Sequence, residues 1–328
     1  ISSASYVGDK EGKGPLRECF DKICRDDTLG LDSWEQAESR MFESAVRVAL
    51  AKIKRQSDDL SCLLGGDLLN QIISSGFAAR EIRAPFIGLY GACSTISEGL
   101  MLGGMLVDGG FAELAACAAS SHFSAAERQF RYPLEMGVQA VPSSQRTVTG
   151  AGSIIIQAAG EFRPGAGNVF EHVALTGGTI GSVEDFGITD ANNMGAAMAP
   201  AAFKTIKTHL SDYSRRVEDY DRIITGDLGI FGSDMLYELL RGEGIEIADR
   251  HEDCGKLMFS PEQNVNCGAS GCGCAATIMS SWFLPKIESG EIRRVLFLAT
   301  GALMSPVSSL QGESIPSIAH AVVIEHID

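Results

Sequence analysis

An internal repeat constrains the fold of this chain more than any other feature of its sequence. The segment 59–68 (DLSCLLGGDL) aligns without gaps on the segment 219–228 (DYDRIITGDL), at an offset of 160 residues. Further along, the segment 110–120 matches the segment 290–300 at an offset of 180 residues. Every matched segment contains an apolar run typical of a buried strand. The repeat predicts two similar halves, with extra residues inserted in the second.

Helical patterns precede the first matched strand of each half. Apolar residues recur at helical spacing from Phe42 to Ile53 and from Ala202 to Leu210, and Ser33 with Gln36 predicts a cap for the first helix. Strands alternating with helices are typical of an α/β protein with mostly parallel sheets buried on both faces. We therefore expect an N-terminal half over residues 1–165 and a C-terminal half over residues 166–328, sharing one body.

The amino-terminal end lacks part of the repeat. Residues 1–8 match residues 174–181, so the start of the corresponding strand in the second half, around His172 and Val173, has no partner. The chain also opens on Ile1 rather than Met. We expect a truncated first strand, in a trimmed chain or an ordered fragment.

Composition disfavours several classes of partner. The 42 Asp and Glu residues outnumber the 27 Lys and Arg residues, which gives a formal net charge of −15 and a pI of about 4.9. This charge disfavours nucleic acid and direct insertion into an anionic membrane. The most apolar stretch, 101–121, is interrupted by Asp108 and Glu113 and falls short of a membrane span. Nine cysteines at irregular spacing favour reduced thiols in the cytosol.

Cys93 is the strongest candidate for a functional side chain. It follows the apolar run 85–91 and precedes a helical pattern that begins at Thr95, so it is predicted at a strand-to-helix turn. Backbone N–H groups at a helix start favour an anion and lower the pKa of a thiol. The alternative, an inert buried cysteine, is about as common. The repeat places Gly273 opposite Cys93, and this asymmetry favours a functional pocket.

Six segments spread over nearly the whole chain carry a family resemblance. They are 66–71 (GDLLNQ), 90–95 (YGACST), 120–133 (SSHFSAAERQFRYP), 187–190 (GITD), 198–202 (MAPAA) and 315–320 (IPSIAH). Together they closely resemble the stage V sporulation protein AD family. The resemblance implies a thiolase-like fold, in which two pseudo-symmetric βαβαββ-type halves form a layered α/β/α/β/α body.

The same resemblance implies a role and a set of partners. The family is associated with uptake of dipicolinic acid, pyridine-2,6-dicarboxylate, into the developing bacterial endospore. Its members resemble the soluble part of an assembly whose other members are membrane-embedded channel proteins. We therefore expect a homodimer in the cytoplasm of the forespore or mother cell, held at the spore inner membrane through protein partners. Whether the ligand is the free acid or its calcium chelate stays open.

The resemblance also argues against catalysis. Thiolase-like condensing enzymes combine this cysteine with a His and a second His or Asn from the second half. At the matching positions this chain has Gly226 and Asp227, just past the segment 221–225, and the segment 268–270. Asn266 and His320 do not sit where the pattern requires. We expect a binding pocket with a vestigial nucleophile. The rival hypothesis is a condensing enzyme or acyl carrier that uses Cys93, and a third is a structural subunit with a vestigial pocket.

A dicarboxylate ligand needs hydrogen-bond donors at both ends. We expect the N–H groups behind Cys93 and Ser94 to bind one carboxylate, within a local patch of positive potential around Cys93 and His122. The remaining candidate ligand-binding residues follow. They are His122, Arg128 and Arg131 for the other carboxylate, with Asp67, Ser270 and His320. Several have structural alternatives: a hydrogen-bonded core histidine for His122, and interface contacts for the two arginines. For Asp67 and the equivalent Asp227, which end matching strands, we favour a cap of the turn that follows the strand.

No metal or cofactor is expected. The spacing Cys-x4-Cys-x-Cys at Cys267, Cys272 and Cys274, even together with Cys254, is not a familiar zinc pattern, and core packing explains it better. The glycines between positions 103 and 110 lack the strand-loop-helix context of a dinucleotide fingerprint.

Overall fold

Two mixed β-sheets organise the computed structural model, which describes residues 1–130, 141–159 and 168–328. The first sheet has the strand order β2 (Lys22–Ile23), β1 (Ser2–Val7), β7 (Gly150–Gln157), β5 (Leu114–Ser121), β3 (Cys62–Gly66) and β4 (Phe86–Gly88). The second has the order β10 (His251–Asp253), β9 (Arg222–Thr225), β12 (Arg294–Ala302), β13 (Ser317–His326) and β8 (Val173–Thr179). A small third sheet pairs β6 (Arg146–Thr147) with β11 (Ala269–Ser270).

The strand orders of the two large sheets match element by element. The order β1-β7-β5-β3-β4 in the first half corresponds to β8-β13-β12-β9-β10 in the second. The expectation of mostly parallel sheets is confirmed, because the strands of each large sheet share one direction except β7 and β13, which run antiparallel to both of their neighbours. Strand β13 runs antiparallel to β12 because the connection between them returns directly along the sheet, whereas a parallel pair needs a longer crossover.

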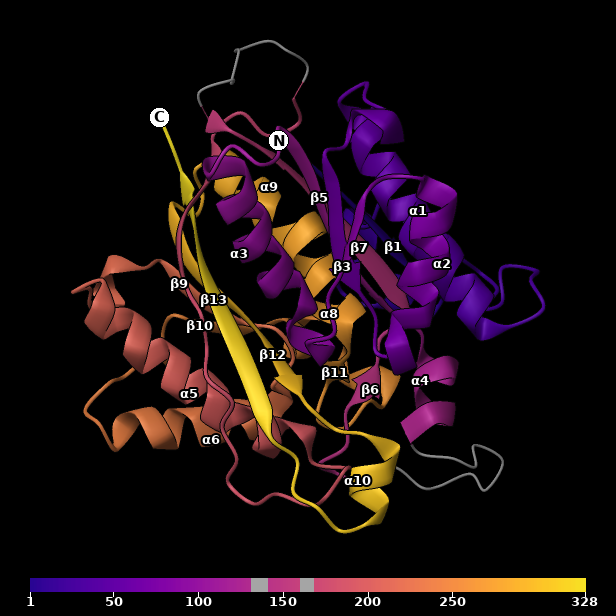
Figure 1. Ribbon diagram of the computed structural model, residues 1–328. Helices are drawn as coiled ribbons and strands as arrows, with labels where there is room; N and C mark the ends of the chain where they lie inside the picture. Colours follow the sequence, from indigo (N-terminus) through magenta and orange to yellow (C-terminus); the bar gives the residue numbers. More distant parts are fainter. Residues whose placement is uncertain (131–140, 160–167) are drawn as a thin grey trace.

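Helices separate and cover the sheets, giving five layers (Figure 1). The helices of the described residues are α1 (Trp34–Lys52), α2 (Ile73–Ile82), α3 (Thr95–Asp108), α4 (Phe123–Phe130), α5 (Met194–Asp212), α6 (Gly229–Arg241), α7 (Cys254–Leu257), α8 (Cys272–Ile278), α9 (Leu284–Glu288) and α10 (Pro306–Leu310). Helices α1 and α2 pack outside the first sheet, α5 and α6 outside the second, and α3 and α8 lie between the sheets. The fold class is therefore the layered α/β/α/β/α body expected from the sequence.

Burial explains why these segments form these elements. The side chain of Ser33 accepts the backbone N–H of Gln36, which confirms the predicted cap of α1. Phe42, the apolar residues that follow it in α1 and those of α5 are buried against their sheets in two outer clusters. A third cluster surrounds α3 and α8 at the centre. In the part of the chain that the structure describes, no helix is long and apolar enough to cross a bilayer.

Candidate functional site

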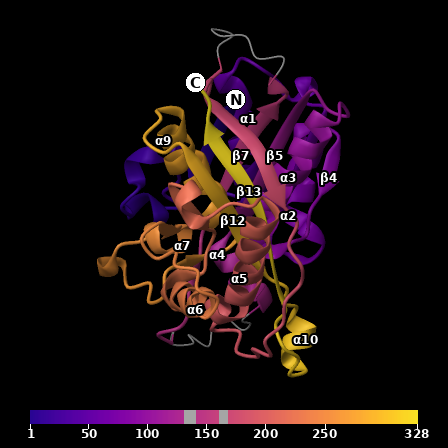
Figure 2. The same cartoon turned by 90° about the vertical axis from the view of Figure 1, so that its left-hand side faces the viewer.

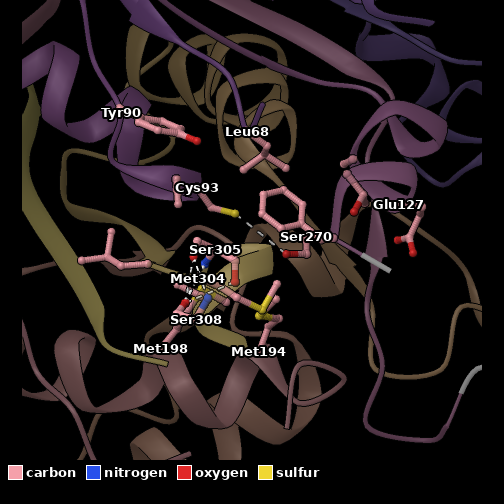
Figure 3. Close-up of a pocket in the computed structure, with 16 residues that line it drawn as sticks. Leu68, Tyr90, Cys93, Glu127, Met194, Met198, Ser270, Met304, Ser305 and Ser308 are labelled. Atoms are coloured by element: carbon pink, nitrogen blue, oxygen red, sulfur yellow. Dashed lines mark hydrogen bonds between the residues drawn. The ribbon is translucent and has the colours of Figure 1, made fainter. Parts of the chain in front are cut away.

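A cavity of about 310 Å³ opens where loops of both halves meet, and Cys93 forms part of its wall (Figure 3). It lies near the carboxyl ends of β3 and β12, where the crevices of α/β sheets usually bind ligands. The described residues that line it are Leu68, Tyr90, Ala92, Cys93, Ala126, Glu127, Phe130, Thr147, Met194, Met198, Ser270, Ala302, Leu303, Met304, Ser305 and Ser308.

Cys93 sits in a tight turn that the sequence predicted correctly. A single 3-10 turn, Ala92–Ser94, joins the loop after β4 to α3. Ala92 has φ of +51°, a left-handed conformation unusual for a residue with a side chain. The following residue, Ser94, is fully buried and donates both its N–H (3.2 Å) and its hydroxyl (2.7 Å) to the carbonyl of Gly91. The N–H group of Ser94 is therefore already used inside the turn.

Asp227 is the polar residue that defines the chemistry at Cys93. Its carboxylate accepts hydrogen bonds from Ser270 Oγ (2.9 Å), the Gly271 N–H (2.9 Å) and Thr300 Oγ1 (3.0 Å). Ser270 Oγ in turn lies 4.0 Å from the Cys93 sulfur (Figure 3). Burial first, and then the Asp227 carboxylate, raise the pKa of the Cys93 thiol well above its usual value. A thiol beside a buried carboxylate stays protonated at neutral pH, so this site disfavours nucleophilic chemistry.

The two equivalent aspartates have different roles. Asp67 is buried and accepts the Leu69 N–H (2.8 Å) together with the N–H (2.8 Å) and hydroxyl (2.7 Å) of Ser75, so it caps the turn after its strand as predicted. The same explanation is wrong for Asp227, which turns toward Ser270. In the second half the capping is done by Asp253, which accepts the N–H groups of the two residues that follow Asp227.

Two predicted histidines are engaged elsewhere in the core. His122 is buried, its Nε2 lies 2.8 Å from the Asp27 carbonyl, and burial lowers its pKa. His320 is buried in β13, accepts the Gly181 N–H at 3.2 Å, and also has its pKa lowered by burial. Neither is among the described residues that line the cavity. Both therefore match the structural alternative of a hydrogen-bonded core histidine.

The predicted arginines do not contribute charge to the described cavity wall. Arg128, on α4, forms an ion pair with Glu35 and lies over the Trp34 ring, 5.3 Å from its centroid. Arg131 falls outside the described residues. Among the described lining residues the charged side chain is Glu127, and no Lys or Arg is present. The positive patch expected around Cys93 and His122 is therefore absent from the described wall.

Apolar side chains, which the sequence reasoning missed, form most of that wall. Met194 and Met198 come from the start of α5, Met304 from the loop after β12, and Phe130 from the end of α4. Figure 3 shows the three methionines on one side of Cys93 and Leu68 and Tyr90 on the other. The family-like segment 198–202 contained one of these residues, but a methionine at helical spacing is more often core than lining. Of the eight predicted residues, the cavity brings together Cys93 and Ser270.

The four cysteines weighed above as metal ligands pack separately in the core. Cys254, Cys267, Cys272 and Cys274 are buried free thiols. Cys272 donates to the Ala92 carbonyl at 2.9 Å, and Cys267 accepts the Phe231 N–H at 3.2 Å. Within the described ranges, no group of three or more His, Cys, Asp and Glu side chains is placed to hold a metal ion.

Solved structures with this architecture include a 3-oxoacyl-[acyl-carrier-protein] synthase III and OleA. The chain superimposes on 3-oxoacyl-[acyl-carrier-protein] synthase III from Aquifex aeolicus with a TM-score of 0.59 at 11% identity, over 99% of each chain. It superimposes on cerulenin-bound OleA from Xanthomonas campestris with a TM-score of 0.60 at 13% identity, over 98% of this chain and 95% of that one. The protein therefore has the thiolase-like fold, while identities this low say nothing about its activity.

Sequence comparison assigns the family. The family model for stage V sporulation protein AD (SpoVAD) matches residues 1–325. Stage V sporulation protein AD of Bacillus subtilis (strain 168) is 44% identical over 324 residues, which cover 99% of this chain and 93% of that protein. The chain belongs to the stage V sporulation protein AD family, as the six segments predicted.

Proposed function

We propose that the chain is a non-catalytic dipicolinic acid-binding protein that supports uptake of dipicolinate into the developing endospore. The cavity beside Cys93 carries this proposal, because it offers a concave site in a chain that has Gly226 and Asp227 where the resemblance implies a His. A volume of about 310 Å³ lies at the small end of the range for ligand pockets, which suits a single aromatic ring. Methionine sulfurs pack well against such a ring, and hydroxyls at the rim can donate to carboxylates.

The partners in this proposal are membrane-embedded channel proteins of the same sporulation assembly. Protein contacts would hold the chain at the spore inner membrane, on the cytoplasmic side, because a net charge of −15 disfavours direct contact with anionic lipid. Dipicolinate would reach the cavity either as the free acid or as its calcium chelate.

Calorimetric titration of the folded protein with dipicolinate tests the binding proposal. We expect saturable binding by wild type and at least about tenfold weaker binding by Ala302→Leu, whose larger side chain occupies the cavity. Ala84→Leu is the matched control, since Ala84 is half-buried and packs in the outer cluster against α1, away from the cavity. The free acid and the calcium chelate are titrated separately.

Two results would count against the proposal. Absence of heat with both ligand forms at millimolar concentration, from correctly folded protein, would remove its basis. A covalent adduct after incubation with acyl-CoA, seen by intact mass and lost in Cys93→Ser, would instead favour the condensing enzyme or acyl carrier.

We further propose that the chain forms a homodimer through the open edge of its first sheet. Strand β4 ends that sheet (Figure 2). Its Ile87 is 42% exposed. Ile73 and Phe77 on the adjacent α2, and Tyr90 after β4, are exposed as well. An uncovered apolar edge strand is a template for pairing with a second copy, which would extend the sheet and bury this surface.

Sedimentation or light scattering tests the dimer. Wild type is expected at twice the chain mass, whereas Ile87→Lys, which places a charge on the pairing edge, is expected to shift the protein to monomer. Phe111→Lys is the control, because Phe111 is 84% exposed but lies in the turn before β5, away from this edge. A monomeric wild type, or an Ile87→Lys variant that stays dimeric, would refute the pairing.

A further inference from the structure

A second pocket, of about 350 Å³, lies at the start of α4, whereas the Cys93 cavity lies along the later residues of that helix. Phe123, the first residue of α4, lines this pocket, whereas Ala126 lines the cavity. The two residues of strand β6 also line different sites: Arg146 lines the second pocket and Thr147 lines the cavity. No described lining residue is shared, so the two are distinct sites.

Three cationic side chains, a kind that the cavity wall lacks, line this second pocket beside four acidic ones. Its lining includes Lys10, Arg25 and Arg146. The Arg146 guanidinium lies 3.7 Å from the centroid of the Phe123 ring, and its Nε is buried without a hydrogen-bond partner. Stacking on an aromatic face fixes the guanidinium plane and leaves its edge available for an oxyanion. Lys10 is near enough that the charge of Arg146, after burial, lowers the pKa of its ammonium group.

Most acidic side chains of the pocket already form hydrogen bonds or ion pairs with other residues. Glu11 is buried, accepts the Thr149 N–H at 3.1 Å, and burial raises its pKa to about 7. Asp9 pairs with Lys13, which lies outside the pocket. Asp26 accepts hydrogen bonds from Thr28 and Gly30 within its own exposed loop. Asp27 is exposed, where water screens its charge.

Like charges held close together favour a bound counterion. Among the described residues neither Lys10 nor Arg146 forms a salt bridge, so the two cations face the pocket without a partner at contact distance, while Glu11 acts on both and Glu127 on Arg146 from farther away. We infer that this pocket binds an oxyanion, a carboxylate or phosphate group of a small ligand, between the edge of the Arg146 guanidinium and the Lys10 ammonium group. Such charge-assisted hydrogen bonds are about twice as strong as neutral ones.

Calorimetric titration of the full chain at low ionic strength tests this site, with inorganic phosphate and acetate as separate probes. We expect wild type to bind at least one probe, and Lys10→Gln and Arg146→Gln to bind it about tenfold or more weakly. Arg47→Gln is the charge-matched control, because Arg47 lines a different pocket. Ala302→Leu should leave this binding unchanged, which separates the site from the Cys93 cavity.

The probes also identify the class of ligand. Binding of phosphate alone indicates a phosphate-bearing ligand, and binding of acetate indicates a carboxylate. Since Arg146 also packs on Phe123, its variant is checked for folding by thermal unfolding, and Lys10→Gln provides an independent test. The inference is overturned if wild type binds neither probe, or if folded Lys10→Gln binds as tightly as wild type.

Discussion

Replacing Asp227 with Ala is expected to lower the free energy of unfolding by about 3 kcal/mol. The carboxylate accepts three buried hydrogen bonds, from Ser270, Gly271 and Thr300, and leaving each buried donor unpaired costs roughly 1–3 kcal/mol. The full sum is not expected, because the substitution also removes a buried acid whose pKa is raised by burial. Urea unfolding followed by circular dichroism measures the difference.

Asp227→Asn removes the negative charge of the side chain but lets it keep its hydrogen bonds. The amide oxygen can still accept from Ser270 and Gly271, and the amide nitrogen can donate to the Thr300 hydroxyl, so this variant should lose much less stability than Asp227→Ala. Loss of the negative charge should lower the pKa of the Cys93 thiol, while burial still keeps it raised. Iodoacetamide should therefore modify Cys93 severalfold faster in Asp227→Asn than in wild type. Cys19, the cysteine that is not fully buried, is the internal control.

The pH dependence of this pair has a definite sign. Burial raises the pKa of Asp227 in the folded protein above its value in the unfolded protein, so the folded state favours the protonated acid. The contribution of this protonated acid to the free energy of unfolding is therefore lost as pH rises above about 4. Asparagine does not titrate, so the stability of Asp227→Asn relative to wild type should increase over the same rise in pH. An unchanged difference between pH 4 and pH 8, or equal Cys93 alkylation rates, would contradict the assigned role of Asp227.

Gly152→Ala is expected to cost about 3 kcal/mol, the upper end of the usual range for overpacking. A Cβ at position 152 of β7 would lie 2.3 Å from the carbonyl carbon and oxygen of Ala276 and 2.8 Å from the Thr277 nitrogen. These are backbone atoms of α8, so relief requires the helix to move away from the sheet. Because α8 begins directly after Ser270 and Gly271, the same movement should weaken ligand binding in the cavity.

Gly99→Ala is the matched control for this prediction. In α3, the nearest contact of an added Cβ is Leu89 Cδ1 at 3.5 Å, an ordinary van der Waals distance. Alanine within a helix stabilises it by roughly 0.5–1 kcal/mol relative to glycine. Thermal unfolding should therefore move the two variants in opposite directions, and a Gly152→Ala protein as stable as wild type would show that β7 and α8 are less closely packed.

The duplicated sequence was sufficient to predict the fold because strand burial and helix periodicity are local patterns. Matched segments at offsets of 160 and 180 residues became β3 with β9 and β5 with β12, in equivalent places of two sheets with the same strand order. The Ser33 cap and the turn at Cys93 depend on residues adjacent in sequence, and both were predicted correctly. The mostly parallel strand direction was predicted as well, whereas the antiparallel direction of β7 and β13 was not, because it is set by how their connections return along the sheet.

Which side chains come together at the site depended on tertiary structure. The sequence identified Cys93, and it identified Gly226 and Asp227 as standing where the family pattern expects a His. That the carboxylate of Asp227 turns toward Ser270 and the Cys93 thiol was decided by Asp253, which supplies the cap that Asp227 would otherwise provide. Arg128 was a reasonable candidate by position but pairs with Glu35, 93 residues away in the chain. The sequence gives the type of each side chain. The direction in which a side chain points depends on partners far away in the sequence, which come within contact distance only in the folded chain.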